Sequence, residues 1–155
     1  MAGPEIVRAE RPEDFEAWDR AHSPERGGLL YSRTVWADAL GASFGRPSTL
    51  LLARLGEKLA GGALLLGPRR SAPAAGRPSG PASGGPLFSL HVFARAEVSP
   101  TRRIPQGVEV LSALARAVVA EGASGPLDAA PSLVDLRALS WAGWRVVPRY
   151  GFALD

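Results

Sequence analysis

The sequence contains no cysteine among its 155 residues. This absence excludes disulfide bonds, thiolate nucleophiles, cysteine-ligated zinc and iron–sulfur clusters. Only two histidines are present, His22 and His91. No second histidine or carboxylate lies at metal-ligand spacing beside His22, so we interpret both histidines as structural and expect no metal site.

Long hydrophobic runs are also missing. No segment approaches the roughly 18 uninterrupted apolar residues of a membrane span, and the N-terminal residues are charged where a signal peptide is apolar. Hydrophobic residues make up 46% and charged residues 21% of the chain, which is ordinary for a globular protein. The composition predicts a single domain over residues 1–155, soluble and located in the cytoplasm.

Positive charge is in slight excess, with a formal net charge of +3. A local excess lies between residues 69 and 103, where Glu97 is the only acid. The arginines of this region are Arg69, Arg70, Arg77, Arg95, Arg102 and Arg103. No aromatic ladder or RNA-binding motif accompanies them, so a solvated loop is favoured over nucleic-acid binding.

The first half of the chain predicts a strand, two helices and a hairpin. Residues 5–9 are β-prone, and a helix from Pro12 would carry Phe15, Trp18 and His22 on one side. A second helix is expected over residues 34–44, capped by Ser32 or Thr34 and ended by Gly45, with an apolar stripe of Trp36, Leu40 and Phe44. Residues 48–67 predict two strands joined at Gly56–Glu57, with both sheet faces covered.

The second half predicts a loop, a strand, a helix and a closing strand. Residues 68–86 contain little besides Pro, Gly, Ser, Ala and Arg, so we expect a flexible loop within the domain. A strand over residues 86–95, a helix over 107–122 and an apolar, β-prone end after residue 144 follow. The order of elements predicts an α/β fold with a mixed sheet flanked by helices.

One C-terminal motif suggests a family. It reads D-x-R-x-x-x-W-x-G-W-x-x-x-x-R-Y and consists of Asp135, Arg137, Trp141, Gly143, Trp144, Arg149 and Tyr150. Together with the tryptophan-bearing helix, the hairpin and the variable loop, it resembles the first GNAT-like domain of Fem-type acyl and aminoacyl transferases. The resemblance spans most of the chain, and it implies that residues 1–155 are the N-terminal half of a two-domain protein.

The resemblance implies transfer of an acyl or aminoacyl group to a small-molecule or peptide amine acceptor. The donor would be acetyl-CoA or aminoacyl-tRNA, and the partner would be a second GNAT-like domain or another copy of the chain. Better-known members act on a peptidoglycan precursor and hold its phosphate with a basic residue two positions after the helix tryptophan. Asp38 occupies that position here, and a carboxylate repels a phosphate.

The sequence offers no catalytic residue and no cradle for coenzyme A. The string from Arg77 to Ala82 fits the Q/R-x-x-G-x-G/A phosphate loop, but Pro78 and Pro81 each delete a backbone amide. We therefore expect no cofactor in this chain. A stand-alone binding or scaffold domain with the same fold remains the alternative to a transferase half.

Candidates for substrate binding or for an interface are Trp36, Asp135, Arg137, Trp141, Trp144, Arg149 and Tyr150. Asp135 and Arg137 would share one face of an extended segment and could position a substrate, although an ion pair or turn is favoured. Core or interface packing is favoured for the two C-terminal tryptophans. We expect one apolar surface around Trp36, Trp141, Trp144 and Tyr150, covered by a partner.

Overall fold

The computed structural model describes residues 3–22, 30–67, 88–93, 99–121, 127–130, 133 and 135–147. Within these residues, five strands form one sheet in the order β1-β2-β3-β4-β5. They are β1 (Glu5–Arg8), β2 (Ser48–Leu55), β3 (Lys58–Leu66), β4 (Phe88–Val92) and β5 (Leu127–Ala129). The first four strands pair antiparallel, and β5 runs parallel to β4. The predicted α/β class with a mixed sheet is thus confirmed.

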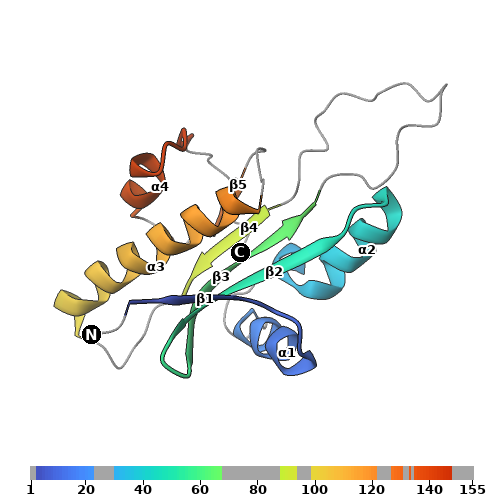
Figure 1. The fold of residues 1–155 in the computed structure, drawn as a ribbon, viewed down its shortest axis with the longest axis horizontal. Helices are drawn as coiled ribbons and strands as arrows, with labels where there is room; N and C mark the ends of the chain where they lie inside the picture. Colours follow the sequence, from blue (N-terminus) through green and yellow to red (C-terminus); the bar gives the residue numbers. More distant parts are fainter. Residues whose placement is uncertain are drawn as a thin grey trace, which may run out of the picture.

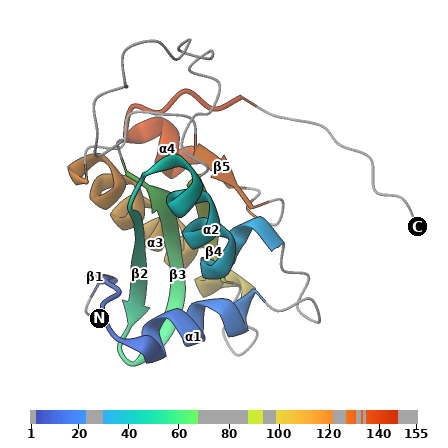
Figure 2. The same cartoon turned by 90° about the vertical axis from the view of Figure 1, so that its right-hand side faces the viewer.

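Helices cover both faces of the sheet (Figure 1). The helices α1 (Pro12–Ala21) and α2 (Thr34–Phe44), with the short 3-10 turn η2 (Leu30–Ser32), lie on one face. The helices α3 (Pro100–Ala120) and α4 (Arg137–Trp141) lie on the other (Figure 2). None of the helices in the described ranges combines membrane-spanning length with sufficient hydrophobicity.

The alternation of side chains along β2 divides the core in two. Leu50 and Leu52 face α1 and α2, where they surround the fully buried Trp18. Leu51 and Ala53 face α3, which contributes a buried stripe to the larger cluster. That stripe consists of Val110, Leu111, Leu114, Ala115 and Val118. Both faces of the hairpin are covered, as its nearly continuous apolar runs predicted.

The hairpin between β2 and β3 turns at the predicted position. Gly56 has a φ of 62°, a conformation that glycine adopts without steric penalty. Residues 68–86, expected to form a flexible loop, lie outside the described residues. The strands on either side of them, β3 and β4, are nevertheless paired neighbours, so the segment connects two strands of one sheet.

Two boundaries differ from the predictions. The helix expected from residue 107 begins at Pro100, so Pro105 lies inside α3. Of the closing strand expected after residue 144, only residues 145–147 are described, and they are irregular; the rest of it lies outside the described residues. The fifth strand instead lies earlier, at Leu127–Ala129, where three residues are too few to give a period-2 pattern.

The buried stripe of α2 also differs from the prediction. Its bounds are as expected and Gly45 ends it with a φ of 63°, but the buried residues are Thr34, Ala37 and Gly41. Trp36 is 38% and Phe44 51% exposed. The buried face thus consists of small residues, and Gly41 lies against the Arg46 backbone, where a larger side chain does not fit.

Candidate functional site

Asp135 and Arg137 form a closed ion pair at the start of α4. Arg137 Nε and Nη2 donate to Asp135 Oδ1 and Oδ2 over 2.9 and 2.6 Å, and the Arg137 amide donates to Oδ1 over 3.2 Å. The hydrogen bonds from Arg137 lower the pKa of Asp135. The extended geometry predicted for these residues is wrong, and the favoured turn with an ion pair is confirmed. Such an exposed pair contributes little stability.

The two C-terminal tryptophans have different environments. Trp141 is 71% exposed, and the Arg137 guanidinium lies 5.9 Å from its ring centroid. Trp144 packs against the core cluster beneath α3, and its Nε1 is buried without a hydrogen-bond partner. The favoured packing role is therefore confirmed for Trp144. Trp141 lies on the surface.

Trp36 does not join these residues. It belongs to α2, which covers the opposite face of the sheet from α4 (Figures 1 and 2). The single apolar surface expected around Trp36, Trp141 and Trp144 is therefore wrong, because the sheet separates its members. Arg149 and Tyr150 lie outside the described residues.

Asp38, which departs from the peptidoglycan-specific pattern, accepts a hydrogen bond from Ser48. The Ser48 hydroxyl lies 2.8 Å from Asp38 Oδ1, and both side chains are at the surface. The contact ties α2 to the start of β2. Asp38 is thus a carboxylate at a position where binding of a phosphate would require a cation.

The two histidines, predicted to be structural, meet in the core although 69 positions separate His22 from His91 in the numbering. Their ring centroids are 4.1 Å apart at an interplanar angle of 85°, and Trp18 lies 4.2 Å from His22. Ser32 Oγ and His91 Nε2 are hydrogen-bonded over 2.9 Å. The cluster joins α1, η2 and β4.

Burial keeps both histidines neutral. Burial, with the neighbouring His22, lowers the pKa of His91 to about 3. Burial also lowers the pKa of His22. His22 Nδ1 donates to the Trp18 carbonyl over 2.9 Å, so Nε2 carries the lone pair, and it has no partner. A neutral histidine bonded to a serine can accept its proton, but Ser32 is fully buried and closed to a substrate.

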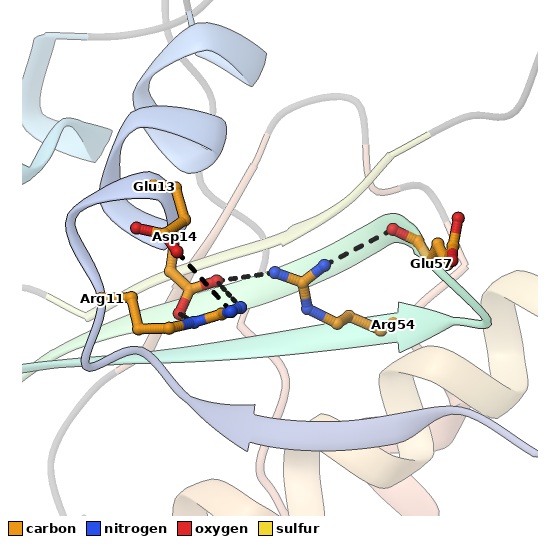
Figure 3. A network of polar contacts seen from close by, with 5 residues as sticks. All are labelled: Arg11, Glu13, Asp14, Arg54 and Glu57. Carbon is orange, nitrogen blue, oxygen red and sulfur yellow. Dashed lines mark hydrogen bonds and ion pairs between the residues drawn. The ribbon is translucent and has the colours of Figure 1, made fainter.

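A second polar centre joins the start of α1 to the β2–β3 hairpin (Figure 3). Asp14 Oδ1 accepts from Arg54 Nη2 over 2.7 Å and from Arg11 Nη2 over 3.2 Å, and Oδ2 accepts from Arg11 Nε over 3.4 Å. Arg54 Nη1 donates to the Glu57 carbonyl over 3.4 Å. This network fastens three segments and engages both oxygens of the Asp14 carboxylate.

Asp19 performs the capping that was predicted for Ser32 or Thr34. Its Oδ1 accepts the Thr34 amide over 2.8 Å and its Oδ2 the Thr34 hydroxyl over 2.6 Å. A carboxylate at a helix N-terminus is stabilising because the free amides carry partial positive charge. Sequence spacing could not reveal this cap, because the acceptor comes from α1.

An open groove of about 640 Å³ runs between α1 and the start of α2. Its lining residues are Pro12, Phe15, Glu16, Asp19, Arg20, Arg33 and Thr34. Arg33 Nε is buried without an acceptor, and such a donor costs about 1–3 kcal/mol. In the part of the chain that the structure describes, no carboxylate pairs with Arg20 or Arg33. Sequence reasoning missed this groove.

The start of α3 has few backbone amides available to an anion. Ser99 precedes the helix, Pro100 provides no N–H, and the amides of Arg102 and Arg103 both donate to the Ser99 carbonyl over 3.0 Å. Few amides are thus free to meet a phosphate there. Among the described side chains, no group of three or more His, Asp or Glu could hold a metal ion.

Comparison with family models, with curated proteins and with solved structures gives no match to this chain. The functional argument therefore depends on the residues and geometry described above.

Proposed function

We propose that this chain is the N-terminal GNAT-like domain of a Fem-like transferase, which moves an acyl or aminoacyl group to an amine acceptor. The donor is acetyl-CoA or aminoacyl-tRNA, the acceptor is a small molecule or peptide, and the reaction takes place in the cytoplasm. The chain is catalytically incomplete alone and works with a second GNAT-like domain or another copy of itself.

The observation that carries this proposal is the order of elements around the sheet. Two helices separate β1 from β2, an antiparallel β2–β3–β4 unit follows, and α3 crosses over to the parallel strand β5. This order agrees with the arrangement on which the family resemblance depends. The Asp135–Arg137 part of the family motif forms a defined turn that begins α4.

The incompleteness of the domain is supported by its polar groups. The carboxylates of Asp14, Asp19 and Asp135 are each engaged by arginine or threonine donors. The neutral His91 is closed off beneath η2. A general base has to reach its substrate, directly or through one water, and these groups do not.

The test compares two purified proteins in a transfer assay. One is residues 1–155, and the other adds whatever coding sequence follows Asp155 in frame or a co-expressed GNAT-like partner. With labelled acetyl-CoA and aminoacyl-tRNA as donors and a panel of amines as acceptors, transfer is expected only from the second protein. Transfer by residues 1–155 alone would contradict the incompleteness.

A binding or scaffold domain is the second candidate, and the closed Asp135–Arg137 pair favours it. Three contacts satisfy both side chains, so neither is poised to position a substrate. If no partner restores transfer with either donor, this second function replaces the first.

A further inference from the structure

We propose that the groove between α1 and α2 binds a small amphipathic molecule through its carboxylate group. The guanidinium groups of Arg20 and Arg33 would hold the carboxylate, and Phe15 with Pro12 would contact the apolar part. This inference goes beyond the proposed transferase role and does not depend on it, since the groove lies between two helices away from the family motif.

The first argument is the unsatisfied donor on Arg33. Its Nε is buried and has no acceptor, whereas the large majority of buried polar groups in proteins are hydrogen-bonded. A carboxylate offers two oxygen atoms in a plane, which matches the fork of N–H donors on a guanidinium. Because Nε itself is closed to solvent, a ligand carboxylate would meet the remaining N–H groups of Arg33, which lines the groove.

The second argument is the balance of charge, which selects the kind of anion. Two cations, Arg20 and Arg33, line the groove with two carboxylates, Glu16 and Asp19. Asp19 already accepts two hydrogen bonds from Thr34, so it neutralises the start of α2 rather than the arginines. Because the lining charges sum to zero, the groove has no excess positive charge to offset the higher cost of removing a doubly charged phosphate from water, so a single carboxylate is favoured.

The third argument is the apolar surface beside the arginines. Pro12 and Phe15 lie in the first turn of α1, and Phe15 is only half-buried. The groove, about 640 Å³ in volume, is largely open to solvent, so a ligand there would stay partly exposed. The chemistry of the groove thus suits a ligand with an aromatic or aliphatic body and one carboxylate.

The test is a titration of the ¹⁵N-labelled chain with 3-phenylpropanoate, followed by amide chemical shifts. We expect shifts concentrated at Phe15, Arg20 and Thr34, and a Kd on the order of 1 mM for so small a ligand. The neutral amide, 3-phenylpropanamide, and phenyl phosphate should each bind at least several-fold more weakly. Equal binding of the amide would overturn carboxylate recognition, and tighter binding of the phosphate would overturn the choice of anion.

Charge variants sharpen the test. R20Q and R33Q should each weaken 3-phenylpropanoate binding about tenfold, as expected for the loss of a charge-assisted contact. E16Q should tighten it, because a repelling carboxylate is removed. R145Q, an exposed arginine outside the groove, is the matched control and should bind like the original chain. Arg20 is exposed, so R20Q decides the matter even if R33Q folds poorly. Unchanged binding by R20Q would overturn the proposal.

Discussion

Asp14 is a single carboxylate that holds two arginines from different elements, Arg11 and Arg54. Burial alone would raise the pKa of Asp14, but the hydrogen bonds and charge of Arg11, with the hydrogen bond of Arg54, keep it below 3.8. The ionised form is therefore favoured by folding. The resulting stability is fully present above pH 3.8 and is lost as the pH falls through the lower pKa of the folded protein.

We predict that D14N lowers the free energy of unfolding at pH 7 by about 1–3 kcal/mol, because an amide cannot neutralise the two guanidinium groups. Urea denaturation followed by circular dichroism measures the loss. The control is E13Q, since Glu13 is exposed and its nearest contact with Arg11 is 3.6 Å. E13Q should change stability by less than about 0.5 kcal/mol, and an equal loss in both variants would contradict the role of Asp14.

His91 also makes the fold acid-sensitive, because folding favours the neutral form of its ring. Its pKa is lowered to about 3, so the unfolded chain takes up a proton near pH 6.5 before the folded chain does. Stability is therefore complete above pH 6.5 and falls as the pH drops toward the folded pKa. For the neighbouring His22, burial likewise lowers the pKa, and the negative charge of Asp19 partly offsets that lowering.

We predict that the free energy of unfolding falls by about 2 kcal/mol between pH 7 and pH 5 through His91. Urea midpoints at half-unit pH steps measure this slope. H91Q removes the titrating group while keeping a polar side chain near Ser32, so its midpoint should vary less across the same range. A slope in H91Q as steep as in the original chain would show that other groups cause the acid sensitivity.

At the scale of elements, α2 illustrates how packing selects the buried face. Gly41 lies against the Arg46 backbone, and an added Cβ would come within 2.6 Å of the Arg46 carbonyl oxygen. The large residues Trp36 and Phe44 cannot occupy such a close contact. They face outward, and the stripe predicted from their spacing is replaced by Thr34, Ala37 and Gly41.

We predict that G41A destabilises the protein by about 1–3 kcal/mol, because overpacking against backbone outweighs a gain in helix propensity of about 1 kcal/mol. Thermal unfolding provides the measurement. The exposed neighbour Ala42 serves as the control, since A42G should lose only the propensity difference, about 1 kcal/mol. A higher melting temperature for G41A would mean that Arg46 does not constrain this position.

We predict different outcomes for the two tryptophans that follow the Asp135–Arg137 turn. W144A should lose about 1–3 kcal/mol because its ring packs beneath α3. W141A should lose less than about 1 kcal/mol, since only the exposed contact with Arg137 disappears. Chemical denaturation of the two variants gives both values. A larger loss in W141A than in W144A would mean that α4 packs through the face that carries Trp141.

At the scale of the whole molecule, we predict that residues 1–155 show no measurable binding of coenzyme A. Pro100 has no amide N–H to offer at the start of α3. The amides of Arg102 and Arg103 both donate to the Ser99 carbonyl, so they are not free to bind a phosphate. Isothermal titration tests this, with the two-domain or partner-containing protein as the comparison. A Kd in the low micromolar range would show that the phosphate site lies elsewhere in the chain.

Much of the fold was predictable because its signals are local. Pro12 and Gly45 set helix boundaries through backbone geometry, Gly56 set the hairpin turn, and the apolar runs on either side of it indicated a sheet covered on both faces. The Asp135–Arg137 pair was also predictable, because two residues two positions apart need no tertiary structure to meet. The same local reasoning failed for β5, whose three residues pair with β4 across a long crossover.

The sequence by itself therefore determined the class of fold, an α/β arrangement with a mixed sheet, and the order of nearly all its elements. Only the tertiary structure decided which side chains meet. It brought His22 to His91, Asp19 to the start of α2, and Arg20 and Arg33 into one groove. The physical reason is that propensity and periodicity act over a few residues, whereas these contacts join elements whose approach is set by the packing of the whole core.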